Sequence, residues 1–295
     1  MHEEIKNDNT GVFVTLTFSC EELEKLTKET NLEECNAVAT IAVRRFLERW
    51  RKEHKKSVKH WLITELGHQN TERIHLHGII FTTKVKDIVK HWKYGNVTIG
   101  NKPYEPKQWK SATNENSFVN AKTVNYIVKY MTKIDNDHKG FEGIVLCSPG
   151  IGKNYLNREK VNQYNEEKTI ETYRLNNGAK IPLPIYYRNK LYTEDEREKL
   201  WINKINKGKY YINGIEFNLK NEKDWLIIDN VRKKQQQVNK ILAYGDDSIE
   251  FKKKNYNITL KMLNKEKKIQ ELKDKSNENI YISSMQRKFN SNDKF

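Results

Sequence analysis

Two histidines separated by one residue lie in a short apolar segment of the chain. His75 and His77 occur in the sequence RIHLHGIIF, whose β-branched and aromatic residues predict a strand. Side chains alternate between the two faces of a strand, so both imidazoles are expected on one face, about 7 Å apart. The residues expected on the other face, in apolar packing, are Ile74, Leu76 and Ile80. Two imidazoles in this arrangement can converge on one divalent cation.

A carboxylate on the preceding segment could complete this metal site. Residues 60–66 also predict a strand, and the GHQNTE sequence after them is rich in turn-forming residues, so the two strands are predicted to form an antiparallel hairpin. A register that pairs Glu65 with His75 also pairs Ile63 with His77, and paired residues share a face. Two nitrogens and one oxygen suit manganese, magnesium or zinc, with positions left open for a phosphate oxygen.

The other histidines of this region have different expected roles. His68 lies in the predicted turn and is an alternative third ligand. His54, His60 and His91 are predicted to be solvated. Because a histidine on a strand is often a hydrogen-bonded structural residue, the His-Leu-His sequence alone leaves a metal site and a structural role both open.

A later segment, YIVKYMTK, combines two tyrosines with two lysines. Residues 120–133 predict a helix with about 100° between successive residues. An arc of about 100° on this helix carries the polar set Tyr126, Lys129, Tyr130 and Lys133. The opposite side carries the aliphatic set Val124, Ile127, Val128 and Met131. A phenol has a pKa near 10, so its attack on phosphorus needs the help that a metal-polarised phosphate and nearby ammonium groups give. The pattern permits tyrosine nucleophiles, and a basic helix that only contacts DNA is the alternative.

The composition points to a polyanionic partner. The 295 residues include 54 Lys and Arg against 39 Asp and Glu, a net charge of +15 that would attract nucleic acid. The same surplus could reflect a lysine-rich proteome. Three widely spaced cysteines imply no disulfide framework, and no apolar run approaches the roughly 18 residues of a membrane span. These features predict a cytoplasmic protein with no membrane partner.

The order of the predicted elements indicates an α+β fold. Strands are expected at 12–19, 60–66, 73–82, 95–100 and 143–147, and helices at 34–54, 85–92 and 120–133. This alternation predicts a central antiparallel sheet flanked by helices. After about residue 160 the periodicity weakens and tyrosines become frequent. We therefore predict a first domain over residues 1–160, a Tyr-rich extension of it over 161–220, and a basic, mostly helical tail over 221–295.

Three motifs, in this order, resemble those of a known superfamily. FVTLTF at 13–18, HLHGII at 75–80 and the tandem tyrosine–lysine helix resemble the motifs of HUH rolling-circle replication initiators. The paired tyrosines, SPGIGKNYL at 148–156 and PLPIYY at 182–187 resemble the replication-initiation proteins of microviruses, above all the gokushovirus-like branch. The resemblance covers about residues 12–192 and does not extend to the tail.

The resemblance implies a fold and a metal site. The first domain would be an HUH endonuclease domain with a central antiparallel sheet. His75 and His77 would be metal ligands and Glu65 the third ligand, with manganese or magnesium as the preferred cofactor and zinc as a further option.

The resemblance also implies a reaction. Tyr126 and Tyr130 would act in turn as nucleophiles, and Lys129 and Lys133 would contact phosphates. The protein would nick a single-stranded DNA origin, which can include a hairpin, form a 5′-phosphotyrosine link and rejoin the DNA during rolling-circle replication.

This reaction needs no ATP, because transesterification to a phenol conserves the phosphodiester energy. The SPGIGKN sequence agrees, since Cys147 and Asn154 replace the Gly and the Ser or Thr of a phosphate-binding loop. Unwinding of duplex DNA would therefore fall to a separate host helicase, in a bacterial cytoplasm if the chain is phage-encoded.

Two alternatives remain open at this point. The chain could be a plasmid initiator, a mobilisation relaxase or a transposase of the same superfamily, although the tandem tyrosines disfavour the single-tyrosine classes. It could instead be a non-catalytic nucleic-acid-binding protein with a structural zinc. Structural zinc sites usually have four ligands, often Cys, and the three cysteines lie far in sequence from the histidine pair.

Overall fold

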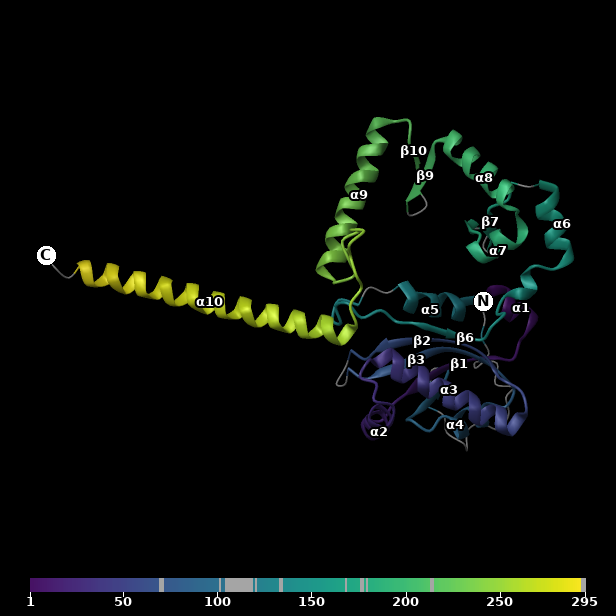
Figure 1. Cartoon of the computed structure of the whole chain (residues 1–295), viewed down its shortest axis with the longest axis horizontal. Coiled ribbons are helices and arrows are strands. Elements are labelled where there is room, and N and C mark those ends of the chain that lie inside the picture. Colours follow the sequence, from purple (N-terminus) through teal and green to yellow (C-terminus); the bar gives the residue numbers. More distant parts are fainter. Residues whose placement is uncertain are drawn as a thin grey trace.

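A six-stranded antiparallel sheet forms the centre of the structure, which is a computed structural model. The structure describes residues 1–68, 72–100, 102–103, 119, 121–132, 135–167, 169–175, 178, 180–212 and 215–292. The strands, in the order β5-β4-β1-β3-β2-β6, are Lys102–Pro103, Val97–Ile99, Gly11–Thr17, Ile74–Phe81, Lys59–Leu66 and Val145–Cys147. The predicted α+β class with a central antiparallel sheet flanked by helices is confirmed (Figure 1).

One face of the sheet carries the main hydrophobic core. It is covered by α2 (Cys20–Thr30), α3 (Cys35–His54) and α4 (Val85–His91) (Figure 1). The core contains, among others, Leu16, Phe46, Trp50, Leu62, Leu76 and Ile80. The even-numbered residues of β3 therefore point into this core, as the alternation predicts.

Local signals at the helix ends explain two of these helices. Glu34 begins α3 by accepting a hydrogen bond from the backbone N–H of Ala37, and Ser19 begins α2 by accepting one from Glu22. The sequence predicted α3 within one residue of its start but missed α2. Its segment CEELEKLTKET is mostly polar, and Leu26 is its one buried residue, so its apolar periodicity is weak.

The opposite face of the sheet is covered by α5 (Ala121–Thr132) (Figure 1). A smaller core forms there between the helix and the odd-numbered strand residues, and it consists of Phe13, Ile79, Phe81, Val124 and Ile127. The predicted aliphatic stripe is only partly correct, because Val128 is 43% exposed. Contact with the sheet centres between Val124 and Ile127, which leaves Val128 at the side of the helix.

The chain after β6 builds a second group of elements with its own core. These are the short 3-10 helix η1 (Lys153–Tyr155), α6 (Arg158–Glu167), β7 (Thr172–Arg174), β8 (Lys180–Pro182), α7 (Ile185–Leu191), α8 (Glu194–Lys207), β9 (Lys209–Ile212) and β10 (Ile215–Asn218). Their core contains Tyr155, Tyr164, Leu183, Leu191, Tyr192 and Leu200. The frequent tyrosines of this region are therefore largely packing residues, and the hydroxyls of Tyr155 and Tyr164 hydrogen-bond each other at 2.6 Å.

The C-terminal region is helical, as predicted. It consists of α9 (Glu222–Ile241) and α10 (Tyr256–Asn292), and α10 extends away from the rest of the chain (Figure 1). None of the helices in the described ranges is long and apolar enough to span a bilayer.

A buried carboxylate fastens the N-terminal helix α1 (His2–Asn7) to the sheet. Glu4 is 3% exposed and accepts hydrogen bonds from Lys59 Nζ of β2 and from the backbone N–H of Gly152, both at 2.7 Å. Lys59 also donates to Asp8 at 3.0 Å. Burial by itself raises the pKa of Glu4, but the bonds from Lys59 and Gly152 outweigh it, so the pKa is lowered overall.

We expect Glu4→Gln to lower the free energy of unfolding by about 1–3 kcal/mol at neutral pH, because Lys59 loses its ionised partner in a buried site. The folded-state pKa of Glu4 is lowered, so its contribution is present above the ordinary Glu range and is lost as pH falls through the folded-state pKa. Denaturant unfolding across pH 3–7 should therefore give curves for the two proteins that converge in acid. Glu21→Gln, on the exposed first turn of α2, is the control. A Glu4→Gln deficit that is absent at pH 7 would contradict the assignment.

Candidate functional site

The register of the β2–β3 hairpin is the one predicted. Glu65 pairs with His75, and Ile63 pairs with His77. On the other side of β3, Thr15 and Thr17 of β1 pair with His77 and His75 respectively. The histidines therefore lie on the central strand, flanked by a carboxylate on one side and by two hydroxyls on the other.

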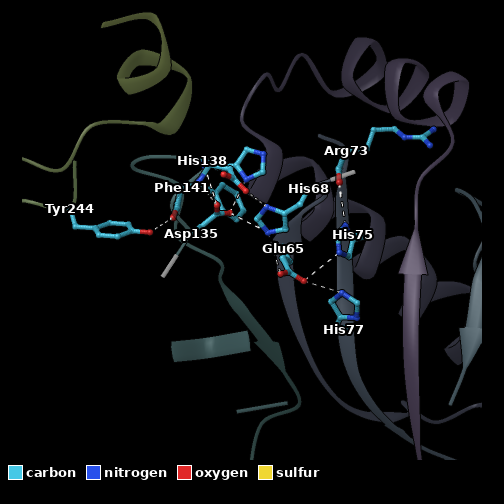
Figure 2. Close-up of polar contacts among 10 residues, drawn as sticks. Glu65, His68, Arg73, His75, His77, Asp135, His138, Phe141 and Tyr244 are labelled. Atoms are coloured by element: carbon cyan, nitrogen blue, oxygen red, sulfur yellow. Dashed lines mark hydrogen bonds and ion pairs between the residues drawn. The ribbon is translucent and has the colours of Figure 1, made fainter. Parts of the chain in front are cut away.

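The three predicted metal ligands lie together. The Oε2 atom of Glu65 is 3.4 Å from Nε2 of His75 and 3.1 Å from Nε2 of His77 (Figure 2). All three ligating atoms lie within 4.8 Å of one another. Ligands bound to one cation at about 2.0–2.2 Å lie up to roughly 4.4 Å apart, so this group can bind a metal ion with little movement.

The second nitrogen of each imidazole is held by the sheet. Nδ1 of His77 lies 3.0 Å from Oγ1 of Thr15, and Nδ1 of His75 lies 3.3 Å from the carbonyl oxygen of Arg73. A carbonyl only accepts hydrogen bonds, so Nδ1 of His75 carries the proton and Nε2 presents its lone pair toward Glu65. Such contacts to the outer nitrogen are the usual support of a metal-binding histidine. The donor set therefore fits a divalent cation.

Glycine at position 78 is required by the close approach of β2. A Cβ atom there would lie 2.0 Å from the carbonyl oxygen of Trp61 and 2.7 Å from Cα of Leu62. Neither atom can move without disturbing the strand that carries Glu65. The glycine that follows the histidine pair thus lets β2 and β3 pack closely beside the metal-binding group.

The helix that carries the predicted nucleophiles faces this side of the sheet. Tyr126 is 48% exposed, and its ring meets the edge of Phe13 with a centroid distance of 5.9 Å. Phe13 in turn stacks on His77 at 6.3 Å. Tyr126 is therefore separated from the histidine group by one aromatic ring. The side chains of Lys129 and Tyr130, and the whole of Lys133, lie outside the described residues.

A second group of ligating side chains, which the sequence did not indicate, adjoins the first. His68 lies with Asp135 and His138, and the ligating atoms of these three residues are within 4.8 Å of one another. Nε2 of His68 is 3.8 Å from Oε1 of Glu65, the carboxylate oxygen that faces away from His75 (Figure 2). The structure thus groups His68 with Asp135 and not with the His75 pair. The spacing of Asp135 and His138 directly after the tyrosine helix was the available signal.

The prediction that His54, His60 and His91 are solvated is wrong. His60 and His91 are each 6% exposed, and the side chain of His54 is 8% exposed. Burial lowers the pKa of His60 and of His91. The error arises because the chain near these residues is polar, while Trp50 of α3 packs against the rings of His54 and His91.

Comparison with known proteins finds a match over part of the chain. Residues 11–135 match the family model of the replication-associated protein ORF2. The match extends from β1 to the residue Asp135 beyond α5 and therefore includes both groups of ligands except His138. No curated protein and no solved structure matches the chain. The family match supports a replication initiator, whose partner would be nucleic acid.

The contact between Thr15 and His77 gives a test of the metal-binding group. We expect Thr15→Val to weaken divalent-cation affinity by about 10–100-fold, because the imidazole loses the group that orients it. Isothermal titration with Mn²⁺ measures the affinity, and circular dichroism checks the fold. Thr17→Val is the matched control, since the Thr17 hydroxyl donates to the carbonyl oxygen of Asn96 and not to a histidine. Equal weakening in both variants would mean that the Thr15 hydroxyl has no special role.

Proposed function

We propose that this chain is a metal-dependent DNA endonuclease of replication initiation, which nicks a single-stranded origin through a tyrosine. One observation carries the proposal: Glu65, His75 and His77 converge on one point, beside a helix that presents an exposed tyrosine. The family match over residues 11–135 supports it, because it covers both the strands and the helix.

The chain's own residues would divide the chemistry between two elements. His75, His77 and Glu65 would hold a divalent cation, which when bound would polarise the scissile phosphate and offset its developing negative charge. The phenolic oxygen of Tyr126 forms a bond to phosphorus while the bond from phosphorus to the 3′ oxygen breaks. The phenolic proton leaves to solvent and the departing 3′ oxygen gains a proton, so the step balances without a cofactor that is consumed.

Exposure favours Tyr126 over the tyrosines of the second core. Burial raises the pKa of Tyr155, and it raises that of Tyr192 to about 12, so neither phenol ionises readily. Both are also closed off by packing, since each is less than 5% exposed. Tyr126 is accessible to a DNA phosphate and lies on the same side of the sheet as the histidines.

The finer assignments follow from the motifs named above. We propose HUH chemistry of the microvirus type, with alternating Tyr126 and Tyr130, a 5′-phosphotyrosine intermediate, and Lys129 and Lys133 as phosphate contacts. Manganese or magnesium is the expected cofactor, and a host helicase the expected partner. The division of the chain at residues 160 and 220 stays a prediction.

The nucleophile is tested by trapping the covalent intermediate. A labelled single-stranded origin incubated with the protein and Mn²⁺ should give an adduct that resists SDS, and peptide mapping should place it on Tyr126 and Tyr130. Tyr126→Phe and Tyr130→Phe should each retain some nicking, and the double variant should lose all of it. Tyr186→Phe, an exposed tyrosine on α7, is the control and should nick normally.

Adducts confined to Tyr126, with normal rejoining by Tyr130→Phe, would remove the two-nucleophile mechanism but leave nicking intact. Undiminished nicking by the double variant would refute tyrosine catalysis.

Metal dependence is tested separately from DNA binding. His75→Ala and His77→Ala should abolish nicking, because each removes one ligand, while single-strand binding should persist because it depends on backbone charge. Glu65→Ala should behave in the same way, and excess chelator should reproduce all three defects in the unmodified protein. Full cleavage in chelator would show that the group has no catalytic metal, and would favour a structural role for the histidines.

A further inference from the structure

We propose that His68, Asp135 and His138 form a second divalent-cation site, linked to the first through the carboxylate of Glu65. This inference goes beyond the proposed nicking reaction and rests on it only for the identity of the first site. Imidazole nitrogens with a carboxylate oxygen suit Mn²⁺ or Zn²⁺.

Glu65 stands between the two groups with one oxygen toward each. Its Oε2 lies 3.4 Å and 3.1 Å from the Nε2 atoms of His75 and His77, and its Oε1 lies 3.8 Å from Nε2 of His68 (Figure 2). The same His68 nitrogen lies 3.9 Å from Oδ2 of Asp135. A carboxylate placed in this way can bridge two cations, as carboxylates do in sites where two metal ions lie close together.

The loop after α5 is shaped around the Asp135 carboxylate. Its Oδ1 accepts hydrogen bonds from the backbone N–H groups of Asp137 and His138, at 3.1 and 2.9 Å. Its Oδ2 lies 2.7 Å from Nδ1 of His138, which is 3% exposed. Asp137 holds His68 from the outside, with its Oδ2 2.9 Å from Nδ1, so that Nε2 of His68 points inward. The outer nitrogen of His68 is thus supported in the way that metal-binding histidines are.

Charge separates this group from the third cluster of ligating residues in the described ranges, Glu53, His54 and His91. In that cluster Lys90 Nζ lies 2.7 Å from both carboxylate oxygens of Glu53, and Lys84 Nζ lies 3.0 Å from Nδ1 of His54. Two ammonium groups would repel a dication there.

Around Asp135 the charges have the opposite sign. The ion-pair partners of Asp135 and Asp137 within the described ranges are histidines, and Glu65 adds a third carboxylate. A cation would therefore be attracted to the His68 group and not to the Glu53 cluster.

The position of the second site gives it a consequence for the helix of the tyrosines. Asp135 follows the end of α5 at Thr132 by three residues, whereas His68 follows the end of β2 at Leu66 by two. A cation bound by both would tie the end of the helix to the strand that carries Glu65. These side chains would act as positioning residues for α5, because none of them needs to touch the DNA.

Metal stoichiometry of the full-length protein tests the proposal. After equilibrium dialysis against Mn²⁺, the unmodified protein should hold two equivalents. His68→Gln and Asp135→Asn, two changes that keep side-chain size, should each hold one, and so should the His75→Ala/His77→Ala double variant. His54→Gln is the matched control in the cluster flanked by lysines and should hold two. Circular dichroism identifies any variant that fails to fold, and the remaining variants then decide the result.

Bridging by Glu65 has its own signature. Two Mn²⁺ ions that share a carboxylate couple magnetically, so the electron paramagnetic resonance spectrum at two equivalents should differ from twice the spectrum at one. One equivalent in the unmodified protein, or two equivalents retained in both His68→Gln and Asp135→Asn, would overturn the second site. Failure of the proposed function looks different: two equivalents would bind, and no DNA adduct would form.

Discussion

The pairing of β3 with both of its neighbours is the constraint on which the rest of the site depends. Along an antiparallel strand, a slip of one residue sends every side chain to the other face. In this sheet such a slip of β2 would move Glu65 into the core and Leu66 toward the histidines. Leu62 and Leu76 are fully buried on the core face, so the packing that stabilises the sheet also fixes the position of the carboxylate. Gly78 adds a second restriction, because any side chain there would collide with Trp61.

The two faces of the sheet differ in how much of their area is covered. Three helices pack against the even-numbered residues of β3, and their large core accounts for most of the apolar burial. On the other face, α5 buries Val124 and Ile127 against Phe13, Ile79 and Phe81. Beyond these residues the odd-numbered positions become His77, His75 and Glu65, which remain partly exposed. A metal-binding group can therefore sit on the sheet without interrupting its core.

The parts of the site that the sequence predicted are those set by local rules. Period-two alternation and a short turn suffice to pair Glu65 with His75, and both features are visible within about twenty residues. Helical periodicity likewise places Tyr126 away from the sheet. The partnership of His68 with Asp135 could not be predicted in this way, because it depends on how a loop after α5 folds back onto the turn after β2. The burial of His54 and His91 depends in the same way on the packing of α3 against α4.

The C-terminal region is also part of this long-range arrangement. Phe141 of the loop after α5 is buried, its carbonyl oxygen accepts a hydrogen bond from the Tyr244 hydroxyl at 3.2 Å, and its ring meets Tyr256 at 5.3 Å (Figure 2). A Cβ on Gly140 would lie 2.6 Å from the Thr259 side chain, so the start of α10 packs directly on the loop. Burial raises the pKa of Tyr244, and it raises that of Tyr256 to about 12, which keeps both phenols neutral in these contacts. The base of the tail thus braces the segment that holds Asp135 and His138, while the rest of α10 extends away from the sheet. Contacts cross the boundary predicted at residue 220, and the geometry of the ligand groups depends on both sides of it.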